Sequence, residues 1–167
     1  LLDLDRFKSI NDEHGHLVGD VVIRRAARAV NKTLRGTDFA VRYGGEEFLL
    51  VLQDTGTHQA TDAATRIRVA IAHIDLDDVV QGVTVTASQG VALRGVGEPV
   101  DAWIARADAA LYSAKNAGRD QVQVAEDALP PLKDRAGEST QSAPVISDPD
   151  LDSSPETLDP TDTDAGD

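Results

Sequence analysis

Apolar and polar residues alternate along residues 1–126 in patterns that predict five short strands and three helices. Apolar side chains recur at every third or fourth position after Asp20, over residues 57–74 and after Asp101, which is the spacing of helices that bury one face. Short apolar or alternating runs predict strands at residues 1–5, 39–43, 47–52, 83–88 and 121–125. The order β-α-β-β-α-β-α-β is typical of an α+β domain with a mostly antiparallel sheet of the ferredoxin-like or polymerase-palm type and helices packed on one face.

The connections follow from the glycines and polar residues between these elements. Residues 7–19 are polar and contain two glycines, so we expect a loop there. Asp20 and Asp101 stand where helix N-caps are expected. Gly44 and Gly45 are expected to form a hairpin turn between two strands, because glycine accepts positive φ without a steric clash.

Charge divides the chain into two parts. Residues 1–126 carry 14 basic and 18 acidic side chains, a net charge of −4, whereas residues 127–167 carry 2 and 11, a net charge of −9. The second part has no apolar periodicity and is rich in Pro, Ser, Thr and Asp. We therefore predict a folded domain at residues 1–126 and an acidic disordered tail at residues 127–167. The acidic surface argues against a polymeric nucleic acid as a partner.

The composition excludes several kinds of site. The chain has no cysteine, so it forms no disulfide, zinc–thiolate site or thiol nucleophile. No apolar run approaches the roughly 18 residues of a membrane span. The chain begins inside an expected strand and without an initiator methionine, so we interpret it as a domain cropped from a longer protein.

Three carboxylates are expected to meet at one end of the sheet. Asp3 lies in the first expected strand, and Glu46 and Glu47 follow the two glycines of the hairpin. Clustered carboxylates are costly without a cation, and oxygen ligands favour Mg²⁺ or Mn²⁺, which suits phosphoryl chemistry. The alternative interpretation, which G-G-E-E alone would favour, is a solvated turn with ordinary surface acids.

Four segments in order resemble the GGDEF-domain diguanylate cyclases, in the G-G-E-E-F variant. These segments are D-L-D-R-F-K-S-I-N-D-E-H-G-H-L-V-G-D (3–20), R-G-T-D-F-A-V-R-Y-G-G-E-E-F (35–48), V-T-A-S-Q-G-V-A (85–92) and A-D-A-A-L-Y-S-A-K-N-A-G-R-D (107–120). The resemblance implies an enzyme that joins two GTP molecules into cyclic di-GMP and releases two pyrophosphates. Each subunit of a homodimer would hold one GTP, whose 3′-hydroxyl attacks the α-phosphate of the other.

The resemblance also implies roles for individual residues around the metal. Asp3, the backbone carbonyl of Leu4 and Glu46 would ligate Mg²⁺ or Mn²⁺. Glu46 would also be the base for the 3′-hydroxyl, and Glu47 would add negative charge and could contact the metal. Gly44 and Gly45 would lie close to the nucleotide, where a Cβ would collide with it.

The guanine and ribose contacts implied by the resemblance come from residues 11–20. Asn11 and Asp20 would recognise guanine, His16 would lie near the ribose, and Lys8 would touch phosphate. An N-cap role for Asp20 and a loop hydrogen bond for His16 remain as alternatives.

Two further groups of residues are assigned through the resemblance. Lys115 and Arg119, four apart at the end of the last helix, would hold the triphosphate, although cations are also favourable at any helix C-terminus. Arg35 and Asp38 match the R-x-x-D spacing of the inhibitory product site, where Arg66 would be a second arginine. The alternative for Arg66 is a solvated helix face.

The match is incomplete in two places. The D-x-L-T-G-L-x-N-R-R motif that opens the family domain is not in this sequence, and Gln89 replaces a residue that is usually aliphatic. A catalytically impaired fragment that acts as a cyclic di-GMP or GTP receptor is therefore the alternative function. The resemblance implies a cytoplasmic domain, an upstream sensor domain, and a parent protein that a segment outside this sequence could anchor to a membrane.

Overall fold

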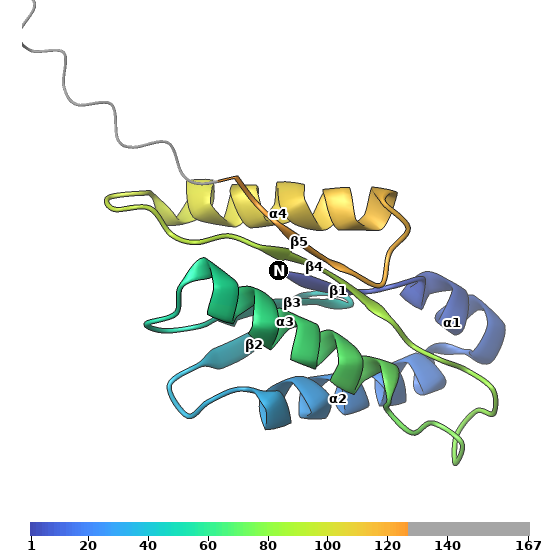
Figure 1. Cartoon of the computed structure of the whole chain (residues 1–167). Helices are drawn as coiled ribbons and strands as arrows, with labels where there is room; N and C mark the ends of the chain where they lie inside the picture. The colour runs from blue at the N-terminus through green and yellow to red at the C-terminus, as the bar shows by residue number, and fades with distance from the viewer. Residues whose placement is uncertain (127–167) are drawn as a thin grey trace, which may run out of the picture. The chain divides into compact units, whose positions relative to one another are not determined.

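The computed structural model describes residues 1–126, which form a five-stranded sheet with helices on both faces (Figure 1). The elements follow one another as β1 (Leu2–Leu4), α1 (Phe7–His14), α2 (His16–Thr33), β2 (Phe39–Gly44), β3 (Glu47–Val51), α3 (Thr57–Ala72), β4 (Ala87–Val91), α4 (Val100–Asn116) and β5 (Val122–Val124). The predicted tail at 127–167 lies outside the described residues, so it stays a prediction.

The sheet has the strand order β2-β3-β1-β4-β5, with β1 at its centre. Three of the four strand pairs are antiparallel, and only β4 and β5 run parallel. The sequence-based expectation of a mostly antiparallel, palm-type sheet is therefore confirmed.

The core lies between one face of the sheet and α1, α2 and α3. Leu2 and Leu4 of β1 are 0% and 1% exposed, and Phe48 of β3 lies opposite Leu2 in the register. Val22 and Val30 of α2 are fully buried on this side, as the helical spacing predicts. The apolar stripe of the sequence thus fixes which side of α2 packs on the sheet.

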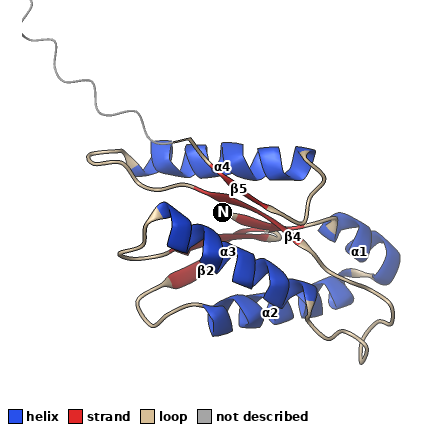
Figure 2. Cartoon of the chain, viewed as in Figure 1, coloured by secondary structure: helices blue, strands red, loops and turns tan. Residues whose placement is uncertain are grey.

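The helix α4 covers the opposite face of the sheet, so the expectation of helices on one face is wrong. Figure 2 shows α4 on one side of the strands and α2 and α3 on the other side. In β4, Gln89 donates to the Ala64 carbonyl of α3, whereas Gly90 abuts the backbone of α4. Neighbouring strand residues point to opposite faces. Because α4 connects two parallel neighbours, it must cross one face, and α2 and α3 already occupy the other.

Residues 7–19 are not a loop, because α1 and the first turn of α2 form there. Phe7 and Ile10 are buried three residues apart, and the polar residues between them form the exposed face of a short helix. Gly15, with φ 83°, joins the two helices. Asp20 is therefore inside α2 and is not an N-cap, which removes that alternative interpretation.

Other boundaries shift by a few residues. Gly44 ends β2 and pairs with Glu47, so the hairpin turn is Gly45–Glu46, and neither glycine has positive φ. The strand β4 begins at Ala87 rather than at residue 83. Pro99 precedes α4, and Asp101 lies in the first turn without capping it.

Candidate active site

Strand pairing brings the carboxylates of distant segments to one end of the sheet. Asp3 of β1 lies directly opposite Glu47 of β3, and the Leu4 amide donates to the Glu46 carbonyl at 3.3 Å. Directly opposed residues of antiparallel strands project from the same face. Asp3 and Glu47 therefore share the face that α4 covers, beside the turn that carries Glu46.

Lys115 near the end of α4 completes this cluster. Its Nζ lies 2.8 Å from Oδ2 of Asp3, which is only 6% exposed. Burial raises the pKa of Asp3 above its ordinary value of 3.8, and the charges of Glu46 and Glu47 raise it further. The hydrogen bond from Lys115 opposes this rise. The site is thus an anionic cluster that one lysine only partly compensates.

The oxygen atoms at this end of the sheet fit a hard divalent cation that takes its remaining ligands from water and from substrate phosphates. Among the described residues, no three carboxylate or imidazole side chains are grouped so as to hold a metal ion by themselves. Mg²⁺ is commonly held by one or two carboxylates together with water and substrate phosphates. Asp3, Glu46 and the Leu4 carbonyl would offer only oxygen ligands, which hard divalent cations prefer. Burial, followed by the charges of Glu46 and Glu47, raises the pKa of Asp3, and a bound cation would favour its ionised form.

The side chain of Asn11 in α1 lies against Gly19 of α2. A Cβ added at Gly19 of α2 would lie 2.0 Å from Oδ1 of Asn11, so only glycine leaves room for this amide. Asp20 follows Gly19 and is exposed, so the two residues predicted to bind guanine come from adjoining turns of these helices. His16 is exposed at the start of α2.

The predicted phosphate ligands Lys8 and Arg119 are both exposed, but the expectation that Arg119 shares a helical face with Lys115 is wrong. Lys8 pairs with Asp12 at 2.7 Å, and both side chains are exposed on α1. Arg119 does not share a helical face with Lys115, because α4 ends at Asn116 and Gly118 has φ 117°. Arg119 instead lies in the connection to β5, with φ 67° and an exposed side chain.

Asp5 is a buried residue that the sequence analysis left without a role. It is 6% exposed and accepts hydrogen bonds from the hydroxyls of Thr86 and Ser88 and from the Asp120 amide. Its alternation with Asp3 in the first strand was the available signal, since it placed both carboxylates on one face. The hydrogen-bond partners are more than 80 residues away and gave no local signal.

The R-x-x-D segment forms a compact turn between α2 and β2. The Asp38 carboxylate accepts hydrogen bonds from the backbone amides of Arg35 and Gln53 at 3.1 and 3.2 Å. This arrangement leaves the Arg35 side chain exposed. Within residues 1–126, no hydrogen bond or ion pair joins Arg66 to this turn, so its place in a product site stays a prediction.

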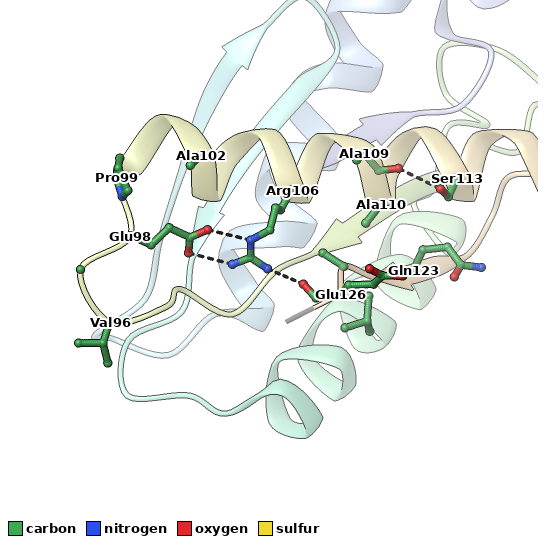
Figure 3. Close-up of a pocket in the computed structure, with 13 residues that line it drawn as sticks. Val96, Glu98, Pro99, Ala102, Arg106, Ala109, Ala110, Ser113, Gln123 and Glu126 are labelled. Carbon is green, nitrogen blue, oxygen red and sulfur yellow. Dashed lines mark hydrogen bonds and ion pairs between the residues drawn. The ribbon is translucent and has the colours of Figure 1, made fainter. Parts of the chain in front are cut away.

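A cavity of about 760 Å³ lies elsewhere, between α4, β5 and the segment before α4. Figure 3 shows Arg106 reaching across it to the Glu98 carboxylate and to the Glu126 carbonyl. None of the predicted site residues lines this cavity. Its arginine is engaged within the chain, so the cavity is not a candidate active site.

None of the four helices in the described part of the chain is long and apolar enough to cross a membrane.

The structure therefore defines an α+β domain with a mostly antiparallel palm-type sheet and with a carboxylate cluster and a lysine at one end. Residues 1–121 match the family described as "Diguanylate cyclase, GGDEF domain". The chain therefore belongs to the GGDEF-domain family, and the resemblance stated from the sequence is confirmed.

Curated relatives and solved structures agree with this assignment. The chain is 42% identical over 125 residues to the diguanylate cyclase DgcP of Pseudomonas aeruginosa, covering 75% of this chain and 19% of that protein. It is 37% identical over 121 residues to the diguanylate cyclase DgcZ of Escherichia coli, covering 72% of this chain and 41% of that protein. The chain thus spans less than half the length of these relatives.

Two solved structures share the fold. The GGDEF domain of DgcB from Caulobacter crescentus, in complex with c-di-GMP, is 36% identical with a TM-score of 0.69, covering 74% of each chain. The active GGEEF domain of a diguanylate cyclase from Vibrio cholerae is 31% identical with a TM-score of 0.69, covering 76% of this chain and 81% of that one.

Proposed function

We propose that this chain is a diguanylate cyclase domain that condenses two GTP molecules into cyclic di-GMP and releases two pyrophosphates. The observation that carries the proposal is the pairing of Asp3 with Glu47 across β1 and β3, beside Glu46 and within reach of Lys115. Its relatives of 37–42% identity named as diguanylate cyclases support the same reaction.

The residues divide into three roles. Asp3, Glu46 and the Leu4 carbonyl would hold Mg²⁺ or Mn²⁺, which neutralises the phosphates and acidifies the 3′-hydroxyl when bound. Glu46, in the turn beside Asp3, accepts the proton of the 3′-hydroxyl as this oxygen attacks the α-phosphate of the second GTP. Lys115 exchanges part of its contact with Asp3 for the triphosphate, which presents more negative charge.

The residues proposed to select guanine lie in α1 and α2. Asp20 accepts from the N1–H and N2 amino groups of guanine, a donor pair that adenine lacks, and Asn11 adds an amide contact. The close approach of Gly19 to Asn11 supports this assignment, because the amide of Asn11 then lies beside the turn of α2 that carries Asp20.

Product inhibition is assigned to the turn at residues 35–38. Arg35 contacts a guanine of bound cyclic di-GMP, Asp38 pairs with it, and Arg66 provides a second cation. The backbone hydrogen bonds of Asp38 support the proposal by keeping the turn in one shape with the Arg35 side chain exposed. The same turn supports the second candidate function, a receptor that binds cyclic di-GMP or GTP without turnover.

The test is GTP turnover with Mg²⁺, with cyclic di-GMP measured by mass spectrometry. The unmodified chain is compared with Glu46→Ala and with the control Asp62→Ala, which removes an exposed carboxylate on α3. We expect product from the unmodified chain and the control, and a loss of about 100-fold or more in Glu46→Ala.

Cyclic di-GMP binding is measured on the same samples by calorimetry. Tight binding without product would replace the cyclase by the receptor. Neither binding nor product would contradict both functions, and equal turnover in Glu46→Ala would remove Glu46 from the mechanism.

A further inference from the structure

We infer that Asp5 is a positioning residue that fixes the connection Gly118–Arg119–Asp120 and thereby presents Arg119 to the phosphates of the nucleotide. The inference rests on the proposed function for the identity of the ligand. The hydrogen bonds on which it is built do not depend on that function.

The carboxylate of Asp5 joins three segments of the chain. Its Oδ1 accepts from Ser88 Oγ at 2.6 Å, and its Oδ2 accepts from Thr86 Oγ1 at 2.7 Å and from the Asp120 amide at 3.0 Å. Such charge-assisted hydrogen bonds are stronger than neutral ones, and burial strengthens them further. The centre of the sheet is thus tied directly to the segment after α4.

That segment has an unfavourable backbone conformation. Gly118, Arg119 and Asp120 have φ values of 117°, 67° and 44°, so two consecutive non-glycine residues are in the left-handed region. Residues with side chains seldom adopt this region, and two in succession indicate that their surroundings hold them there. Here the amide of Asp120 is held by Asp5, and the amide of Arg119 donates to the Ala114 carbonyl at 3.0 Å.

Arg68 of α3 holds the same segment from a second direction. Its Nη1 lies 2.7 Å from Asp120 Oδ1 and 3.2 Å from the Asp120 carbonyl oxygen. Asp120 is therefore fixed through its amide, side chain and carbonyl, whereas the guanidinium of the preceding Arg119 has no hydrogen bond or ion pair within residues 1–126. A fixed backbone with an exposed cation is the arrangement expected of a preorganised phosphate contact.

Asp5 is distinguished from a metal ligand by its contacts. Three donors already occupy its two oxygens, and it is 6% exposed. Asp3, two residues earlier, contacts Lys115 Nζ. Asp3 in β1 and Asp5 just after it thus act on two cations by different routes: Asp3 forms an ion pair with Lys115 of α4, and Asp5 holds the backbone beside Arg119 in the connection to β5.

The test uses 3′-deoxy-GTP, which cannot react because it lacks the attacking hydroxyl, and GMP, which lacks the β- and γ-phosphates. Affinities for both are measured with Mg²⁺ by calorimetry. Asp5→Ala should weaken 3′-deoxy-GTP binding about 10-fold, the size of one charge-assisted contact, and leave GMP binding unchanged. Asp5→Asn should retain most of the affinity, because its amide oxygen still accepts from the Asp120 amide.

Matched controls separate positioning from general damage. Ser88→Ala removes a hydroxyl partner of Asp5 but keeps the bond to Asp120, so it should bind both nucleotides normally. In an Arg119→Ala background, Asp5→Ala should cause no further loss. Asp5→Ser, which is too short to reach Asp120 but keeps a polar group, replaces Asp5→Ala if that variant does not fold.

The inference would be overturned if Asp5→Ala weakened the binding of both nucleotides equally. It would also be overturned if Asp5→Ala caused its full loss of affinity in the Arg119→Ala background. Amide hydrogen exchange at Asp120 gives a reading that is independent of the nucleotide. It should accelerate at least 10-fold in Asp5→Ala or Asp5→Ser relative to Ser88→Ala. Unchanged exchange refutes the role of Asp5, whereas accelerated exchange in a chain that binds neither nucleotide refutes the proposed function alone.

Discussion

At the scale of single residues, Asp3 is held where its charge lowers the stability of the fold. Burial and the neighbouring Glu46 and Glu47 raise its pKa above 3.8, so the folded state disfavours the ionised form that prevails at neutral pH. Functional sites commonly retain a charge that destabilises the folded state in this way, because the same charge is needed for binding.

The first prediction is that Asp3→Asn stabilises the chain and abolishes its activity. Without the buried charge, the free energy of unfolding at pH 7 should rise by about 1 kcal/mol, the usual size of a single stabilising substitution. The lysine partner tolerates the change, because Lys115 is 31% exposed and can be solvated. Urea unfolding and cyclic di-GMP formation are measured together, with Asp62→Asn as the control. A less stable Asp3→Asn variant would contradict this account of the site.

The second prediction concerns Gly19, where a Cβ would lie 2.0 Å from Asn11 Oδ1 and 3.1 Å from Phe7 Cζ. In Gly19→Ala, the Asn11 amide must rotate away, so GTP affinity should fall about 10-fold while stability changes by about 1 kcal/mol or less. Gly36→Ala is the matched control, since a Cβ there meets nothing within 4 Å. Calorimetric titration with 3′-deoxy-GTP reads the affinity, and equal affinity in both variants would show that Asn11 does not contact guanine.

At the scale of elements, the contact between β4 and α4 sets the distance between the sheet and its outer helix. A Cβ on Gly90 would lie 2.0 Å from the Ala107 carbonyl oxygen and 2.3 Å from the Leu111 nitrogen. Both atoms belong to the backbone, so the helix itself would have to move. Because Lys115 is on the same helix, this contact also determines where the lysine meets Asp3.

The third prediction is that Gly90→Ala destabilises the fold by about 3 kcal/mol, at the upper end of overpacking effects. Gly45→Ala serves as the control for stability, because a Cβ there meets nothing within 4 Å and its φ is not positive. Its free energy of unfolding should stay within about 0.5 kcal/mol of the unmodified chain. A neutral Gly90→Ala would mean that α4 can shift outward freely.

The fourth prediction concerns the segment that leads into α4. Arg106 forms two hydrogen bonds of 2.8 Å with Glu98, which also accepts from the Gly95 amide. These contacts lower the pKa of Glu98 to about 2 from 4.5. Its stabilising contribution is therefore complete above pH 4.5 and is lost as the pH falls from 4.5 towards 2.

The measurement for Glu98 compares urea unfolding of the unmodified chain and Glu98→Gln between pH 2 and pH 7. The difference in unfolding free energy should be constant above pH 5 and shrink below it. A difference that persists unchanged at pH 2 would show that packing rather than charge is responsible.

At the scale of the whole molecule, residues 1–126 provide one set of the proposed site residues. Asp3, Glu47 and Lys115 come from β1, β3 and α4, and strand pairing and α4 packing bring them together once. The proposed reaction consumes two nucleotides held in opposed orientation. On the proposed mechanism, one chain would therefore supply half of the required groups.

The fifth prediction is that specific activity rises with protein concentration. If two chains must meet, turnover per chain should increase about 10-fold for each 10-fold increase in concentration while the chain is mostly monomeric, and should then level off. Turnover and light scattering are measured from nanomolar to micromolar concentrations. Constant specific activity in a monomeric sample would contradict the dimeric mechanism.

The sequence by itself determined the elements with clear periodicity and the family. The stripe of Val22, Ile23, Ala26 and Val30 predicts the buried side of α2, and the hairpin at residues 39–52 forms as expected. These features depend on residues within one or two turns of each other, which a local pattern records. The short helix α1 was missed because its polar residues outnumber the two apolar ones that it buries.

Only the tertiary structure decided which segments meet. It placed α4 on the second face of the sheet and Lys115 against Asp3, and it tied Asp5 to Asp120 across 115 positions. It also explained Gln89, whose amide donates to the Ala64 carbonyl in the core at 2.8 Å. Such contacts arise from packing between elements distant in the chain, and the periodicity of one element contains no information about its partner.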